Sequence, residues 1–251
     1  MKRTVYLLFI FSQILYSQVN TEKYRNIEDS LGFSGLIKLE ASIQTGNTDL
    51  QELGSKILLE YKKPVSAVLL ILNGDYGWNN GKQFSNLALA HLRFVQALNP
   101  GLKFETFTQI NYDKSLLLLF RALGGAGLRF KLIENKTSML WFGSAYMLEY
   151  ERYSAPRRYI DKKKILASRW SNYLSFNLVV QKNVSISSVI YYQPRFDLWR
   201  DTRILSENSL LVSLSSNFAL SVDFNFRYDR FTPVNIKEVD TKSKIGFVYN
   251  F

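Results

Sequence analysis

Apolar and polar residues alternate over long stretches of this sequence, and that alternation narrows the range of possible folds more than any other feature. Between residues 220 and 229, Leu, Val, Phe, Phe and Tyr take the even positions, whereas Ser, Asp, Asn, Arg and Asp take the odd positions. Successive side chains of an extended strand point to opposite faces, so this stretch has one apolar and one polar face. The pattern predicts a strand that is longer than most strands of soluble sheets.

Twelve segments of the chain share this period of two. They lie at residues 31–46, 50–62, 66–78, 84–98, 102–113, 117–133, 138–152, 168–182, 184–198, 202–216, 218–229 and 242–251. An even number is expected of bacterial single-chain barrels, and it leaves both chain ends on one side. The connections are short on that side and mostly longer on the other, as periplasmic turns and external loops are. We therefore predict an all-β protein, a closed antiparallel transmembrane β-barrel of about 12 strands.

The composition fits a barrel that is apolar outside and polar inside. Hydrophobic residues make up 47% of the chain and aromatic residues 15%, yet the mean hydropathy is only −0.10, which is too low for a bundle of membrane helices. After residue 17, the apolar runs are too short to span a membrane as helices. The lack of cysteine excludes a disulfide framework, thiol catalysis and cysteine-ligated metal. A net charge of +11 allows nucleic acid, anionic lipid or anionic solutes as partners.

The beginning of the sequence has the pattern of an export signal. Lys2 and Arg3 precede an apolar segment at residues 5–15, and Ser17 is a small residue suited to a cleavage site. Residues 1–17 are therefore predicted to be a cleaved signal peptide. Residues 18–30 would form a periplasmic segment and residues 31–251 the outer-membrane barrel. Export argues against a nucleic-acid partner, because the protein would leave the cytoplasm.

The last strand carries a second signal. Phe247, Tyr249 and Phe251 alternate with smaller or polar residues, and the sequence stops at the third aromatic. A terminal strand that ends in an aromatic residue resembles the signal read by the outer-membrane barrel-assembly machinery. We therefore predict that this machinery is a partner and that the bacterial outer membrane is the destination.

Four motifs, taken in order, resemble one protein family. Residues 35–49 read GLIKLEASIQTGNTD, residues 121–130 read RALGGAGLRF, residues 191–203 read YYQPRFDLWRDTR, and residues 227–240 read RYDRFTPVNIKEVD. With the strand ending in Phe251, they resemble domain-of-unknown-function family 481, whose members are described as salt-induced outer-membrane proteins. The resemblance covers essentially the whole chain after residue 17 and implies a membrane barrel. It implies no catalytic residue.

Charged residues on the polar faces of the strands are candidates for lining the lumen. They are Lys38, Glu40, Lys56, Glu60, Arg93, Lys103, Glu105, Arg121, Arg129, Glu149, Arg195, Asp223 and Arg227. Because acidic and basic residues are interleaved, we expect ion pairs between strands that fill the interior. A selectivity ring in a small pore is the alternative reading of the same residues.

The excess of basic residues gathers in one predicted loop at residues 152–167. Arg157, Arg158, Lys162, Lys163 and Lys164 are candidates for contact with lipopolysaccharide, since Lys and Arg pair with phosphate groups. A loop that is merely solvated fits the sequence equally well.

His91 is the single histidine of the sequence. A metal site usually needs several such ligands, and a hydrolase needs a nucleophile beside a base, for which Asp75 and Ser85 are neighbours on adjoining strands. We therefore expect no enzyme, metal or cofactor. The sequence predicts an integral outer-membrane barrel, a narrow channel or a structural or envelope-stress protein. A hydrolase centred on His91 and a ligand-binding barrel are the alternatives.

Overall fold

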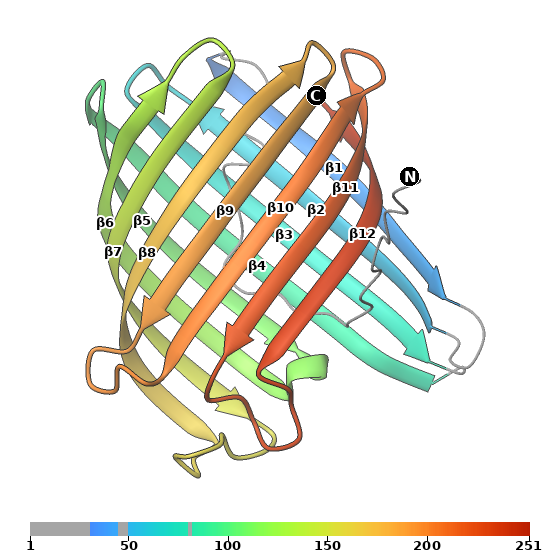
Figure 1. Cartoon of the computed structure of the whole chain (residues 1–251), viewed down its shortest axis with the longest axis vertical. Coiled ribbons are helices and arrows are strands. Elements are labelled where there is room, and N and C mark those ends of the chain that lie inside the picture. The colour runs from blue at the N-terminus through green and yellow to red at the C-terminus, as the bar shows by residue number, and fades with distance from the viewer. Residues whose placement is uncertain (1–30, 45–49, 80–81) are drawn as a thin grey trace, which may run out of the picture.

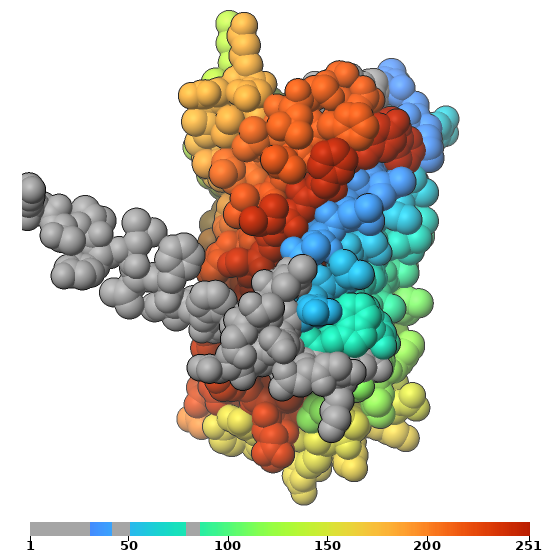
Figure 2. Space-filling view, turned by 90° about the vertical axis from the view of Figure 1, so that its right-hand side faces the viewer, coloured from blue at the N-terminus to red at the C-terminus, as the bar shows by residue number. Residues whose placement is uncertain are grey.

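The strands close into an antiparallel barrel, as the alternation predicts. The computed structural model describes residues 31–44, 50–79 and 82–251, in which each strand pairs with its neighbours in the chain. β1 (Gly32–Gln44) also pairs with β12 (Val239–Asn250). Figure 2 shows these two strands side by side, in blue and red. Closing the ring lets neighbouring strands satisfy one another's backbone hydrogen bonds.

The described residues form twelve strands, and each overlaps one predicted segment. The remaining ten are β2 (Leu50–Lys62), β3 (Ser66–Asn79), β4 (Lys82–Asn99), β5 (Leu102–Asp113), β6 (Leu118–Glu134), β7 (Ser138–Tyr153), β8 (Lys164–Gln181), β9 (Val184–Pro194), β10 (Thr202–Ser213) and β11 (Phe218–Asp229). The predicted fold class is thereby confirmed. The predicted signal peptide at 1–17, the segment 18–30 and the end of the first family motif, GNTD at 46–49, lie outside the described residues.

The two ends of the barrel differ, as Figure 1 shows. Short connections at residues 63–65, 100–101, 135–137, 182–183 and 214–217 lie together at the top of that view, which we call the turn end. Longer connections at residues 154–163, 195–201 and 230–238 lie at the bottom, the loop end. The loop end also holds a short 3-10 helix, η2 (Lys114–Leu116), which is capped by the carboxylate of Asp113. Within the described residues, no helix is long and apolar enough to cross a membrane.

The two largest differences from the predicted strand boundaries, of four residues each, have identifiable reasons. β8 begins at Lys164 rather than at residue 168, because Ile165 and Ala167 are buried and continue the pairing with β7. The basic loop is therefore shorter than predicted. β9 ends at Pro194 rather than at residue 198, because proline has no N–H with which to extend the ladder.

Exposure alternates along the strands with the predicted period. In β11, Ser221 and Asp223 are buried, whereas Val222 and Phe224 are 49% and 47% exposed. The exposed side chains of the wall are largely apolar, and the buried ones are mostly charged or polar. One apolar cluster also fills part of the interior, and it consists of Leu36, Leu58, Ile71, Leu87, Leu89, Ala219 and Val248. The barrel thus has an apolar outer face and an interior of mixed charged, polar and apolar side chains.

Candidate functional site in the barrel interior

The predicted lumen-lining residues lie on the face opposite the exposed apolar side chains. Those that are buried are Lys38, Arg93, Glu105, Arg121, Arg129, Glu149, Arg195, Asp223 and Arg227, and those that are partly buried are Glu40, Lys56, Glu60 and Lys103. The structure gathers most of them into three charged groups and one cavity. Whether solute passes between them stays a prediction.

The first group lies towards the loop end and centres on Glu149 of β7. We call it the loop-end network, and its members are Arg121, Glu149, Glu151, Arg157, Arg169, Arg195, Asp201, Arg203, Arg227 and Asp229. The carboxylate of Glu149 lies 2.6 Å from Arg121, 2.5 Å from Arg169 and 3.0 Å from Arg203. Glu149 is fully enclosed, so these three guanidinium groups take the place of water around its charge.

Arg157 reaches this network from a loop rather than from a strand. Its guanidinium lies 3.1 Å from Asp201 and 3.3 Å from Asp229, and its aliphatic chain is also enclosed, with only 1% of the residue exposed. The prediction that Arg157 contacts lipopolysaccharide is therefore wrong. The loop folds back over the barrel mouth, where the backbone of Arg157 pairs with Pro233 of the loop after β11, and buried carboxylates bind the side chain.

The other basic residues of that loop lie at the surface. Arg158 is partly exposed and donates a hydrogen bond of 2.8 Å to the backbone carbonyl of Ile236. Lys162, Lys163 and Lys164 are exposed, although Lys164 belongs to the beginning of β8. Contact of these four residues with lipopolysaccharide stays a prediction.

The second group joins the strands on both sides of the β1–β12 closure. We call it the seam cluster, and it consists of Lys38, Glu40, Glu52, Asp75, Asp223, Lys242 and Lys244. Lys244 lies 2.9 Å from Glu40 and 2.8 Å from Asp75, and Lys38 pairs with both Glu40 and Asp223. These ion pairs link β1, β3, β11 and β12 through the interior as well as through the wall.

The third group lies on the strands opposite the seam. Glu105 of β5 lies 3.5 Å from Arg93 and 3.4 Å from Arg129, and it accepts a hydrogen bond of 2.9 Å from the hydroxyl of Tyr173. The ring of Tyr173 lies over Gly143, where a Cβ atom would stand 2.0 Å from it. Glycine at that position therefore admits the aromatic ring that orients Glu105.

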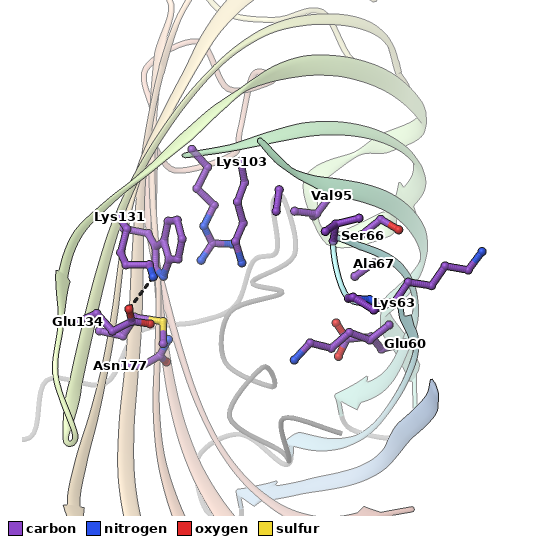
Figure 3. A pocket seen from close by; sticks show the side chains of 16 residues that line it. Glu60, Lys63, Ser66, Ala67, Val95, Lys103, Lys131, Glu134 and Asn177 are labelled. Carbon is purple, nitrogen blue, oxygen red and sulfur yellow. Dashed lines mark hydrogen bonds and ion pairs between the residues drawn. The ribbon is translucent and has the colours of Figure 1, made fainter. Parts of the chain in front are cut away.

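A cavity of about 220 Å³ lies beside this group at the turn end (Figure 3). Trp141 of β7 forms part of its wall, and three cations approach the indole ring. Arg129 is 4.2 Å, Lys103 4.8 Å and Lys131 5.5 Å from the ring centroid. Such distances permit cation–π attraction. We call this site the turn-end cavity.

His91 lies inside the wall of β4 and is fully buried. Its Nδ1 lies 3.2 Å from Oε1 of Gln109, and its ring stacks on Phe107 with centroids 6.2 Å apart. Asp75 belongs to the seam cluster, and the side chain of Ser85 is outside those described. Within the described part of the chain, the structure forms no cluster of three or more His, Asp or Glu that could hold a metal ion.

The charge of Asp201 makes part of the network sensitive to acid. Burial by itself would raise the pKa of Asp201, but the positive charges of Arg169 and Arg157 outweigh it and hold the pKa below its ordinary value. A carboxyl group of this kind stabilises the fold above the pKa of the unfolded chain, about 3.9. That stability is lost as the pH falls through the lower pKa of the folded state.

We therefore expect Asp201→Asn to be less stable than the wild type at pH 7 and the difference to shrink below about pH 4. The midpoint of urea unfolding, followed by the mobility of unboiled protein on a gel, measures this from pH 7 to pH 3. A difference that stays constant over that range would mean that the charge of Asp201 contributes nothing to stability.

Sequence reasoning missed Asp201 and Trp141 as interior residues. Asp201 lies in a connection, where the period of two does not apply. Trp141 stands between Leu140 and Phe142, and in this run of three large apolar residues the alternation that separates inward from outward positions is absent. Its side chain is buried in the interior. The inward position could have been found by counting in steps of two from Glu149.

Comparisons with known proteins agree with the fold. Residues 37–251 match the model of a family described as "Protein of unknown function, DUF481". The COG4313 outer membrane channel from Pseudomonas putida F1 superimposes with a TM-score of 0.55 at 7% identity, covering 93% of this chain and 100% of that one. The NanC porin gives 0.49 at 8% identity, covering 85% and 97%, and the KdgM porin in complex with oligogalacturonate gives 0.45 at 12%, covering 86% and 99%. Among curated proteins, nothing matches the chain.

Proposed function

This chain belongs to DUF481, a family of proteins of unknown function, and we propose that it is an integral outer-membrane barrel that forms a narrow channel constricted at its loop end. Its wall supports the membrane part of this proposal. In a soluble protein the exposed side chains of the wall would be largely polar, whereas here residues such as Val222, Phe224 and Ile245 are about half exposed or more. Apolar side chains suit a face that touches lipid.

Aromatic residues gather near both ends of the outer face. At the turn end, the ring of Phe218 stacks on that of Phe247 with centroids 5.4 Å apart and is tilted against that of Tyr249 at 5.1 Å. At the loop end, Trp170 meets Trp199 edge to face at 6.2 Å. Outer-membrane barrels carry girdles of aromatic residues at the two interfaces between lipid and water. The same aromatics include the proposed assembly signal, Phe247, Tyr249 and Phe251, which is exposed on the outer face.

The loop-end network is the observation that carries the channel part of the proposal. Barrels of eight strands are filled by side chains, and those of 16–18 strands enclose a water-filled channel. This barrel lies between these sizes, and its loop end contains ion pairs that include two arginines from the connections, Arg157 and Arg195. Charged side chains at a constriction decide which ions pass. We infer that Arg157 acts as the main constricting residue, because it extends from the connection after β7 to Asp201 and Asp229, which lie beside each other at the loop end of β10 and β11.

We expect purified wild-type protein in planar bilayers to give small conductance steps, and Arg157→Gln to give steps that are severalfold larger. Loss of the guanidinium leaves Asp201 and Asp229 without a shared partner at the mouth, so the reversal potential in a salt gradient should also move towards that of the cation. Single-channel recording measures both changes.

The neighbouring Arg158 provides a matched control for this experiment. It lies on the same loop but is partly exposed and bonds the backbone of Ile236, so Arg158→Gln should conduct like the wild type. Silent bilayers with wild type and Arg157→Gln alike, from protein that is still folded by gel mobility, would reject the channel and favour a structural or envelope-stress role. We propose no catalytic activity, because the contacts of His91 include Gln109 and Phe107, neither of which is a nucleophile.

The partners that we propose follow from this location. The barrel-assembly machinery would read the terminal strand, and outer-membrane lipid would contact the wall. Lipopolysaccharide would meet Lys162, Lys163 and Lys164, which are exposed at the loop end. Replacing these three lysines with Gln should lower the amount of lipopolysaccharide that co-purifies with the protein, and an unchanged amount would reject this contact.

A further inference from the structure

The turn-end cavity has the size and position of a binding site for a small molecule. It lies in the barrel interior, between the connection of β2 to β3 on one side and β6, β7 and β8 on the other (Figure 3). Its volume of about 220 Å³ is below the range of about 300–1,000 Å³ for pockets that hold drug-sized ligands. A ligand of this cavity would therefore be small.

The charge of the lining favours an anion. Five basic residues line the cavity against two acidic ones, Glu60 and Glu134. One of the five, Lys63, points away from it and lies over the ring of Tyr61 (Figure 3), so four basic side chains remain. Glu134 is already bound to Lys131 at 2.5 Å, and Glu105 is shared between Arg93 and Arg129 just outside. The positive potential that remains would attract a negative group, and a partly enclosed site strengthens that attraction.

Two buried polar atoms in the same wall point to a ligand that is more than a simple anion. Nε1 of Trp141 and Oδ1 of Asn177 have no hydrogen-bond partner among the described residues, although the two residues are only 2% and 3% exposed. Both side chains line the cavity, and Figure 3 shows Asn177 on the same side of it as Lys131 and Glu134. Buried polar groups are normally paired, because leaving them unpaired is costly. The indole N–H needs an acceptor, and the amide oxygen needs a donor.

We propose that the turn-end cavity binds a small organic anion that also carries hydroxyl groups, of the sugar-acid or hydroxy-acid class. Its carboxylate would face Lys103 and Arg129. One of its oxygens would accept from Nε1 of Trp141, and one of its hydroxyl groups would donate to Oδ1 of Asn177. As a solute of the channel, this anion rests on the function proposed above. Its binding to the cavity does not depend on whether the barrel conducts.

Calorimetric titration of the detergent-solubilised full-length protein tests this site without a bilayer. The probe is D-glucuronate, which has both a carboxylate and hydroxyl groups. D-glucose, which lacks the charge, and acetate, which lacks the hydroxyls, are the comparisons. We expect saturable binding of glucuronate that is at least about tenfold tighter than that of either comparison, which is the effect of losing one such contact. Equal affinity for acetate or glucose, or no binding of glucuronate, would overturn the proposal.

Three substitutions locate the binding. Trp141→Phe keeps a ring but removes the N–H, and Lys103→Gln removes a charge without altering the indole, so both should weaken glucuronate binding severalfold. Trp170→Phe is the matched control, because Trp170 lies on the outer face and donates to Ser144. Binding that survives both interior substitutions in folded protein would place glucuronate elsewhere and reject this site. Binding in protein that is silent in bilayers would reject the channel alone.

Discussion

Glu149→Gln should lower the free energy of unfolding by about 3–5 kcal/mol, the usual cost of removing one partner from a buried ion pair. The carboxylate of Glu149 lies within 3.0 Å of Arg121, Arg169 and Arg203 and is fully enclosed. Without its charge, the three guanidinium groups would lose the one carboxylate that they share, although Glu151 still binds Arg121 and Arg203. Urea unfolding of the reconstituted barrel, followed by the mobility of unboiled samples, measures the loss.

Glu238→Gln is the control for this measurement. Glu238 also lies at the loop end, but it is partly exposed and its nearest basic atom, on Arg158, is 3.7 Å away. Exposed ion pairs contribute about 0–1 kcal/mol, so this variant should unfold almost like the wild type. If the two variants unfolded alike, the loop-end network would be a consequence of the fold and not one of its supports.

The Glu149 site shows how far the sequence predicts this interior. The period of two places Glu149 and Arg121 on the polar face, because the rule depends only on the geometry of a strand. It does not say which arginines reach Glu149. Arg203 is 54 positions away along the chain, and its approach depends on the register and tilt of strands that the sequence pattern does not specify.

Loop residues are harder to predict for a related reason. The prediction for the basic loop rests on its composition, and composition does not reveal that Arg157 turns back to bind Asp201 and Asp229. The adjoining Arg158 is the same type of residue in the same loop, but its side chain is partly exposed and bonds a backbone carbonyl. The pairing of the loop after β7 with the loop after β11, at Arg157 and Pro233, determines which of the two arginines is buried.

Val222→Arg is expected to cost about 2–4 kcal/mol if the wall of the barrel faces lipid. Val222 lies near the middle of β11 on the outer face and is 49% exposed, with Leu210 and Ile245 beside it on the neighbouring strands. In water, an arginine on such an exposed position would be solvated and nearly neutral for stability. In the hydrocarbon core, its charge would lose water without gaining a partner. Unfolding in lipid vesicles, measured by gel mobility, gives the cost.

Leu214→Arg separates the effect of depth from the effect of the substitution. Leu214 is 57% exposed in the connection between β10 and β11 at the turn end, where an arginine reaches the interface and should cost only about 0–1 kcal/mol. A large difference between the two variants requires a low-dielectric layer around the middle of the barrel and water at its end. If both arginines were tolerated equally, the outer face would be in contact with water, and neither the membrane location nor the channel could be maintained.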